Sequence, residues 1–70
     1  MSEVKYFFLN GQKFSVKNDL TILEIMKYFN FNTSLLVLEY NNLICHKKNW
    51  NNTIIQTNDK IEIVTIVGGG

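Results

Sequence analysis

Two β-type runs open the chain, and an Asn-Gly pair separates them. Residues 4–9 are strand-forming almost throughout, and residues 13–17 alternate polar and apolar side chains. Asn10-Gly11 between such runs indicates a β-hairpin, because both residues tolerate the positive φ angles of a type I′ turn. The sequence therefore predicts an N-terminal hairpin.

The pattern then changes to a helical period. Apolar residues recur at spacings of three and four, which places them on one face of a helix: Ile22, Ile25, Met26 and Phe29. Either Asp19 or Thr21 can cap the helix, and Glu24 near its start complements the helix dipole. We expect a helix over residues 21–29.

Strand-like runs return after the helix. We expect a polar loop at 30–34 with Phe31 as an apolar plug, and then two strands at 35–40 and 43–45 joined by a tight turn at Asn41-Asn42. An irregular segment at 46–52 and a short apolar segment at 53–55 follow. A turn at Asn58-Asp59 then leads into a last strand at 60–67. Within the irregular segment, Trp50 is expected to fold back over the core.

The order of these elements favours one architecture. A helix that covers one face of a mixed sheet hides the apolar faces of both, and the last strand, the most apolar, would lie centrally beside the first. We therefore predict an α+β fold of the β-grasp (ubiquitin-like) type, with four to five strands packed on one helix. Residues 1–67 would form the body and residues 68–70 a flexible glycine tail.

Composition narrows the class of protein. The 70 residues are 46% hydrophobic, which suits a single small domain and argues against disorder. The one cysteine cannot form an internal disulfide, and a net charge of +1 with scattered lysines lacks the basic stripe of a nucleic-acid-binding protein. No apolar run is long enough to span a membrane, so we expect a soluble, intracellular protein.

Three residue types are missing altogether: Ala, Pro and Arg. Their codons are rich in G and C, whereas the abundant Asn, Ile, Lys and Phe are encoded by A and T. This bias indicates an AT-rich genome, such as that of a plastid or an AT-biased bacterium.

No constellation of side chains predicts catalysis or metal binding. Cys45 and His46 are neighbours, but adjacent strand residues point to opposite faces, and zinc needs three or four ligands. The acidic residues are scattered over turns, the helix and strands, and we expect most of them to be solvated. We therefore predict that the chain is not an enzyme and binds no cofactor or metal.

The chain ends in Gly68-Gly69-Gly70, directly after the most strand-like run. Three residues without Cβ atoms make a thin, pliable thread with the α-carboxylate at its tip. Such a thread can enter a narrow slot on another protein. The alternatives are an end that merely frays and an expression scar.

One face of the sheet offers a second candidate site. If Phe7, Leu9, Phe14 and Val16 face the helix, then Tyr6 and Phe8 point away from it. On the last strand, Val64 and Ile66 would share this outer face with Glu62. An exposed apolar face of this kind indicates docking of a partner, although long aromatic side chains can also simply cover one another.

Taken together, the chain resembles the ThiS family of thiamine-biosynthesis sulfur carriers along nearly its whole length. The resemblance is carried by Leu9-Asn10-Gly11-Gln12, the helix, residues 37–42, Trp50, residues 59–64 and the ending Val67-Gly68-Gly69-Gly70. The family often has glycine where Asn42 and Asn58 stand, and Asn is the next-best residue for a left-handed backbone. The segment Cys45-His46-Lys47 is atypical for the family.

The resemblance implies a mechanism in which partners supply the chemistry. A ThiF-type enzyme would use ATP to adenylate the Gly70 carboxylate, with Gly68 and Gly69 threading into its active site. A desulfurase system would then supply persulfide sulfur, and the resulting Gly70 thiocarboxylate would donate its sulfur to thiazole synthase (ThiG). The protein would work in the plastid stroma or in a bacterial cytoplasm.

Three other functions remain open at this point. One is the small subunit of molybdopterin synthase, which usually runs about ten residues longer and lacks the early Asn-Gly hairpin. Another is a protein modifier joined to lysines through Gly70. The third is a β-grasp interaction domain with an inert tail.

Overall fold

The computed structural model describes residues 4–65, which form a five-stranded sheet and one α-helix. In chain order the elements are β1 (Lys5–Leu9), β2 (Gln12–Val16), α1 (Ile22–Tyr28), the 3₁₀ helix η1 (Thr33–Leu35), β3 (Leu36–Tyr40), β4 (Leu43–Ile44), the 3₁₀ helix η2 (Lys47–Asn52) and β5 (Lys60–Thr65). The last two residues of the strand expected at 60–67 lie outside the described residues, as does the predicted boundary between body and tail.

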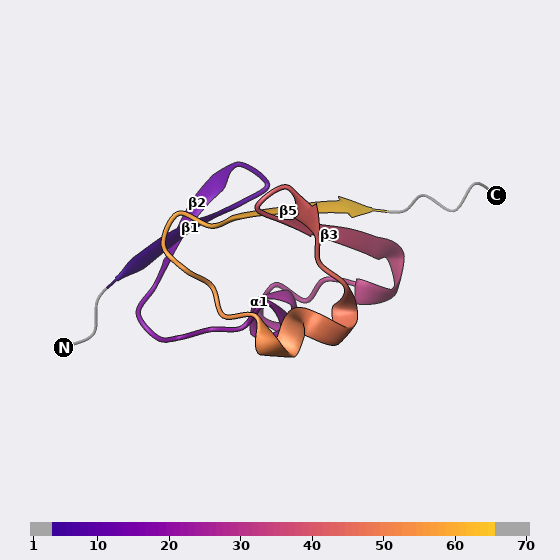
Figure 1. The fold of residues 1–70 in the computed structure, drawn as a ribbon, viewed down its shortest axis with the longest axis horizontal. Helices are drawn as coiled ribbons and strands as arrows, with labels where there is room; N and C mark the ends of the chain where they lie inside the picture. The colour runs from indigo at the N-terminus through magenta and orange to yellow at the C-terminus, as the bar shows by residue number, and fades with distance from the viewer. Residues whose placement is uncertain (1–3, 66–70) are drawn as a thin grey trace.

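The strands follow the order β2-β1-β5-β3-β4, with β5 in the centre. β5 is parallel to β1 and antiparallel to β3, while the two hairpins β1–β2 and β3–β4 are antiparallel. Figure 1 shows α1 on one side of this sheet. The mixed sheet on one helix, with the last strand beside the first, confirms the predicted β-grasp architecture.

Asparagine builds most of the tight turns. Asn10 (φ 51°) and Gly11 (φ 82°) join β1 to β2, and Asn41 (φ 53°) and Asn42 (φ 73°) join β3 to β4. Both pairs have the two positive φ angles that a type I′ hairpin turn requires. Every non-glycine residue with a positive φ angle in residues 4–65 is an asparagine. The predicted hairpins are confirmed.

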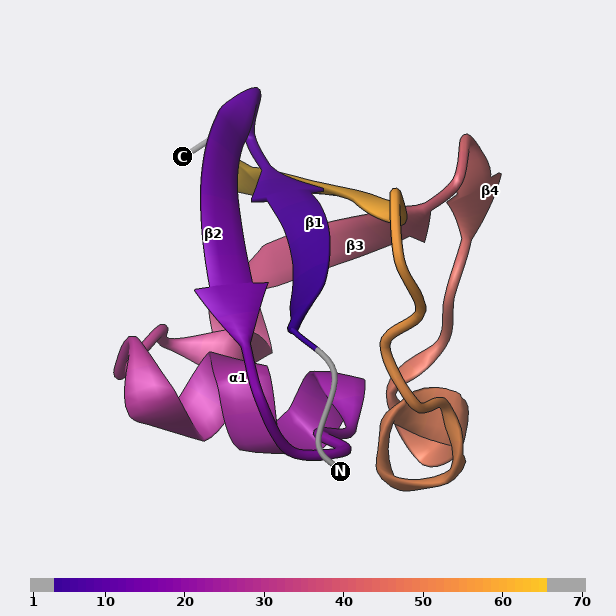
Figure 2. The same ribbon diagram turned by 90° about the vertical axis from the view of Figure 1, so that its left-hand side faces the viewer.

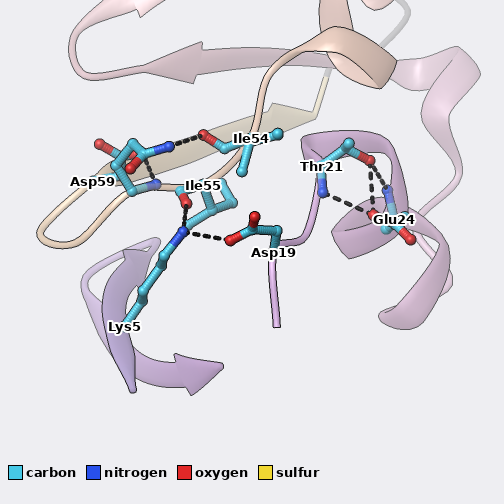
Figure 3. A network of polar contacts seen from close by, with 8 residues as sticks. Lys5, Asp19, Thr21, Glu24, Ile54, Ile55 and Asp59 are labelled. Atoms are coloured by element: carbon cyan, nitrogen blue, oxygen red, sulfur yellow. Dashed lines mark hydrogen bonds and ion pairs between the residues drawn. The ribbon is translucent and has the colours of Figure 1, made fainter. Parts of the chain in front are cut away.

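A capping box starts the helix (Figure 3). The Thr21 hydroxyl accepts a hydrogen bond from the Glu24 backbone N–H (3.1 Å), and a Glu24 carboxylate oxygen accepts one from the Thr21 N–H (2.9 Å). Thr21, and not Asp19, is therefore the N-cap. Asp19 instead forms an ion pair with the Lys5 ammonium at 2.8 Å.

The core lies between the sheet and α1. Its most deeply buried side chains come from every layer: Phe7, Ile22, Ile25, Met26, Leu38, Ile55 and Ile61. The chain between β4 and β5 closes the core beside the start of the helix (Figure 2), where the Ile22 N–H donates to the Thr53 carbonyl (2.9 Å) and the Ile55 N–H donates to the Leu20 carbonyl (2.8 Å).

Trp50 folds back over the core as predicted. It is 2% exposed, and its indole Nε1 donates to the Cys45 carbonyl at 2.9 Å. The expectation of an irregular segment at 46–52 was wrong, because residues 47–52 form η2. A run of polar residues gave no apolar period to reveal this helix, since only Trp50 in it is buried. No helix within residues 4–65 has the length and apolar character to cross a membrane.

Candidate functional site

The sequence predicts a site with two parts, the residues Gly68, Gly69 and Gly70 and the outer face of the sheet. Gly68, Gly69 and Gly70 lie outside the described residues, and so does Ile66. The structure does describe β5, the strand from which the tail continues. The geometry of the site is therefore the geometry of β5 and its neighbours.

Two asparagine side chains fix β5 in the sheet. The Asn10 Oδ1 accepts a hydrogen bond from the Ile63 N–H, and the Asn41 Oδ1 accepts one from the Lys60 N–H, both at 2.8 Å. The backbone N–H groups of the same asparagines donate to the carbonyls of Ile61 and Lys60, respectively, again at 2.8 Å. Each asparagine thus forms a turn and also replaces a missing strand partner of β5.

β5 loses one of its neighbours before it ends. β1 pairs only with the first two residues of β5, through Phe8 opposite Lys60 and Leu9 opposite Ile61. β3 pairs with β5 as far as Thr65, which lies opposite Leu36. The C-terminal half of β5, which leads to the tail, is therefore flanked by β3 on one side, with only the Asn10 side chain reaching it from the β1 side.

A buried carboxylate holds the turn that starts β5. Asp59 is 7% exposed and accepts hydrogen bonds from the Tyr40 hydroxyl, the Asn41 side-chain amide (3.0 Å) and the Gln56 backbone N–H (2.6 Å). Most of the acidic side chains were expected to be solvated, and Asp59 is an exception. A carboxylate can be buried when hydrogen-bond donors surround it, and the sequence does not show which donors the fold gathers.

The same network acts on Tyr40. Burial raises the pKa of the Tyr40 hydroxyl above its ordinary value of 10.0. The pKa is raised further by the hydrogen bond to Asp59, by the negative charge of Asp59 and by the nearby Cys45. The hydroxyl therefore stays protonated and donates to the carboxylate. Together, Tyr40 and Asp59 link the end of β3 to the start of β5.

The structure places Tyr6, Phe8 and Val64 on the outer face of the sheet, away from α1. Tyr6 is 44% exposed, Val64 is 56% exposed and Phe8 is half-buried. They do not form one patch, because Phe8 lies opposite Lys60, four residues before Val64. Tyr6 and Phe8 therefore lie at one end of the face with the lysines of β2 and β5, and the Lys13 ammonium stands 4.5 Å from the centre of the Tyr6 ring.

Around Val64, the outer face contains residues that sequence reasoning had not singled out. Val37 lies directly opposite Val64, and Glu39 lies opposite both Glu62 and Ile44. Ile44 is 60% exposed, and Val37 and Glu39 are half-buried. The alternation of residues 35–40 shows that Val37 and Glu39 lie on the other side of the sheet from Leu36 and Leu38. Only the strand register shows which residues of β4 and β5 lie next to Val37 and Glu39.

Cys45 and His46 follow β4 and are not brought together with other ligands. Cys45 is half-buried, and His46 is exposed at the start of η2 without a capping hydrogen bond from its side chain. Within the described part of the chain, no three His, Cys, Asp or Glu side chains are grouped so that they could hold a metal ion.

Comparison with known proteins identifies the family. The ThiS family model matches residues 4–70. An uncharacterized protein ycf40 from Trieres chinensis is 59% identical over 70 residues, covering 100% of this chain and 96% of that protein. Another uncharacterized ycf40 protein, from Porphyra purpurea, is 34% identical over 62 residues, covering 89% of this chain and 87% of that protein.

A solved structure shares the fold. The crystal structure of the thiamine biosynthesis protein (ThiS) from Geobacter metallireducens matches with a TM-score of 0.80 and 19% sequence identity, covering 93% of this chain and 99% of that one. The family match covers the described residues and continues through Gly70. The chain therefore belongs to the ThiS family of ubiquitin-like sulfur carrier proteins.

Proposed function

We propose that this protein carries sulfur for the thiazole ring of thiamine, with the Gly70 carboxylate as the group that is activated and loaded. The observation that carries the proposal is the family match, which runs through residue 70 and so includes Gly68, Gly69 and Gly70. The central position of β5 supports it, because β3 pairs with this strand as far as Thr65 and so fixes the residue from which the Gly70 end continues.

The chemistry would take place on partner enzymes. On a ThiF-type enzyme, the Gly70 carboxylate attacks the α-phosphate of ATP, which gives an acyl-adenylate and releases pyrophosphate. The terminal sulfur of a persulfide from a desulfurase system then attacks the acyl carbon, and AMP leaves. A thiol reduces the resulting acyl disulfide and frees the thiocarboxylate, whose ionised sulfur is a soft nucleophile for thiazole synthase (ThiG).

The use of glycine in this chain supports a special role for the tail. Five of its turn positions with positive φ angles are occupied by asparagine, and Gly11 is the one glycine among the described residues. A chain that builds its turns mostly from asparagine nevertheless ends in three glycines. Asparagine tolerates the positive φ angles of these turns but adds a side chain, so a narrow slot that excludes side chains would account for the difference.

Reconstitution with a ThiF-type enzyme tests the proposal. With ATP and a persulfide donor, we expect pyrophosphate release and an intact mass in which one oxygen is replaced by sulfur. Gly69→Val is expected to abolish pyrophosphate release without changing the urea unfolding midpoint, and Gly69→Ala to reduce the rate less. Normal pyrophosphate release from Gly69→Val would contradict the threading role of the tail.

The acceptor of the sulfur separates the related functions. Transfer to the product of thiazole synthase supports the thiamine role, and transfer to a molybdopterin precursor would support the small subunit of molybdopterin synthase. Conjugates on lysine side chains would indicate a protein modifier. An unmodified mass, measured on protein purified from its natural source, would indicate an inert tail. The amino-acid composition, which lacks Ala, Pro and Arg and is rich in Asn, Ile, Lys and Phe, fits an AT-rich genome and so supports a plastid stroma or a bacterial cytoplasm as the place of action.

A further inference from the structure

Two carboxylates oppose each other on the outer face of the sheet. Glu39 on β3 and Glu62 on β5 are direct partners in the antiparallel register. Directly opposed residues have Cβ atoms about 4.5–5.5 Å apart and point to the same face, and like charges in this arrangement destabilise a sheet. The free protein therefore keeps an unfavourable pair at the centre of an exposed face.

The surroundings of this pair are largely apolar. On one side along the strands lie Val37 and Val64, and Ile44 stands beside Glu39 on β4. Neither glutamate takes part in an ion pair within residues 4–65, where Lys5–Asp19 is the ion pair that occurs. Lys60 shares the outer face two residues before Glu62, between Phe8 of β1 and Asn41 at the end of β3, but within residues 4–65 its ammonium forms no ion pair with either glutamate.

This face is also continuous with the strand that leads to the tail. Val64 and its partner Val37 lie at the C-terminal end of β5, where β1 no longer covers that strand. Gly70 follows Thr65 by five residues, so a partner that takes up this end would lie within reach of the face. A partner surface of apolar side chains alone would bury two carboxylates without compensation, which costs far more than the apolar contact returns.

We infer that the outer face docks the activating enzyme through a basic side chain of that enzyme, placed between Glu39 and Glu62 and framed by apolar contacts to Val37, Ile44 and Val64. An arginine suits this position best, because its planar guanidinium can donate to two carboxylates at once. The inference rests on the proposed function, since it names the chemistry of the partner that the function requires. Charge complementarity selects this occupant over a purely apolar one.

Neutralising the pair tests the inference through two effects of opposite sign. In the double variant E39Q/E62Q, loss of the repulsion is expected to raise the urea unfolding midpoint of the free carrier. With the ThiF-type enzyme and ATP, the KM for the carrier in pyrophosphate release is expected to rise about tenfold at unchanged kcat, as for loss of a charge-assisted hydrogen bond. A variant that is merely damaged would lose stability and binding together.

A matched control removes a charge from the opposite side of the molecule. Glu24→Gln changes the net charge by the same amount as either single substitution, and glutamine still completes the capping box of α1. This variant is expected to keep the KM of the wild-type carrier. Glu62→Lys places opposite charges across the strands, so it is expected to stabilise the free carrier further and to raise KM more than Glu62→Gln does.

The outcomes separate the inference from the function beneath it. An E39Q/E62Q carrier with the KM of the wild type, or a Glu24→Gln carrier that loses as much as a single variant of the pair, would overturn the inference alone. A wild-type carrier that releases no pyrophosphate with the enzyme would overturn the proposed function and the inference together.

Discussion

The two faces of the central sheet carry similar apolar side chains but differ in how far these are buried. On the face toward α1, Phe7, Leu38 and Ile61 are at most 2% exposed, whereas Tyr6 and Val64 on the outer face are 44% and 56% exposed. The covered face is mostly apolar, with the Tyr40 hydroxyl and its partner Asp59 at one edge, and the outer face mixes apolar residues with charges. The comparison teaches that residue type alone does not show which face of the sheet a residue joins, because the parity of the residue along its strand decides this.

Phe7 and Phe8 give the sharpest test of this difference, because they are neighbours of the same type on opposite faces. Phe7→Ala is expected to lower the free energy of unfolding by about 4 kcal/mol, since it leaves a cavity in the core. Phe8→Ala is expected to lower it by only about 1 kcal/mol. Urea unfolding followed by Trp50 fluorescence measures both, and equal losses would contradict the assignment of the faces.

Acidic residues on the two sides are expected to respond in opposite directions. Asp59→Ala removes the acceptor for three donors, so we expect the free energy of unfolding to fall by about 3 kcal/mol. Glu62→Gln on the outer face is expected to raise the unfolding midpoint instead. Asp19→Asn is the control for an exposed ion pair, with an expected change below about 0.5 kcal/mol. A mild effect of Asp59→Ala would show that the network contributes little.

Two tyrosines, Tyr40 beside Asp59 and Tyr6 on the outer face, extend the comparison to the effect of pH on stability. Tyr40→Phe removes the donor to Asp59, with an expected loss of about 1.5 kcal/mol at pH 7, whereas Tyr6→Phe on the outer face should change stability by less than about 0.5 kcal/mol. Because the folded state raises the pKa of Tyr40, its contribution is fully present below pH 10 and is lost as the pH rises toward the folded-state value.

Unfolding in urea at a series of alkaline pH values checks this sign. The wild-type protein is expected to lose stability above about pH 10 more steeply than Tyr40→Phe does. Parallel curves for the two proteins would mean that Tyr40 ionises equally easily in the folded and the unfolded chain.

The smallest expected effect concerns the turn that sets where β4 meets β3. Asn42 has φ 73°, so Asn42→Ala is expected to cost about 1 kcal/mol, while Asn42→Gly should stay within about 0.5 kcal/mol of the wild type. The two variants differ only in the Cβ, which makes them matched controls for backbone strain. Thermal unfolding of both resolves the difference, and a stable Asn42→Ala protein would place the strain elsewhere.

Local patterns in the sequence were sufficient to predict the hairpins, α1 and the side chains that face the core. Asn10-Gly11 and Asn41-Asn42 predicted both hairpins, because positive φ angles are a local requirement that few residue types meet. The spacing of Ile22, Ile25 and Met26 predicted the buried side of α1, because helical periodicity is set by near neighbours. The architecture followed, since few arrangements hide these faces in so short a chain.

The tertiary structure decided what depends on partners far away in the chain. Nothing near Asp59 in sequence announces that Tyr40 will donate to it, and nothing near Glu39 announces that Glu62 will lie opposite. Strand register is fixed by the packing of the whole sheet, and a shift of one residue would move every side chain to the other face. The sequence by itself therefore determined the body and pointed to the Gly70 end, whereas the charge and shape of the face beside it came only from the fold.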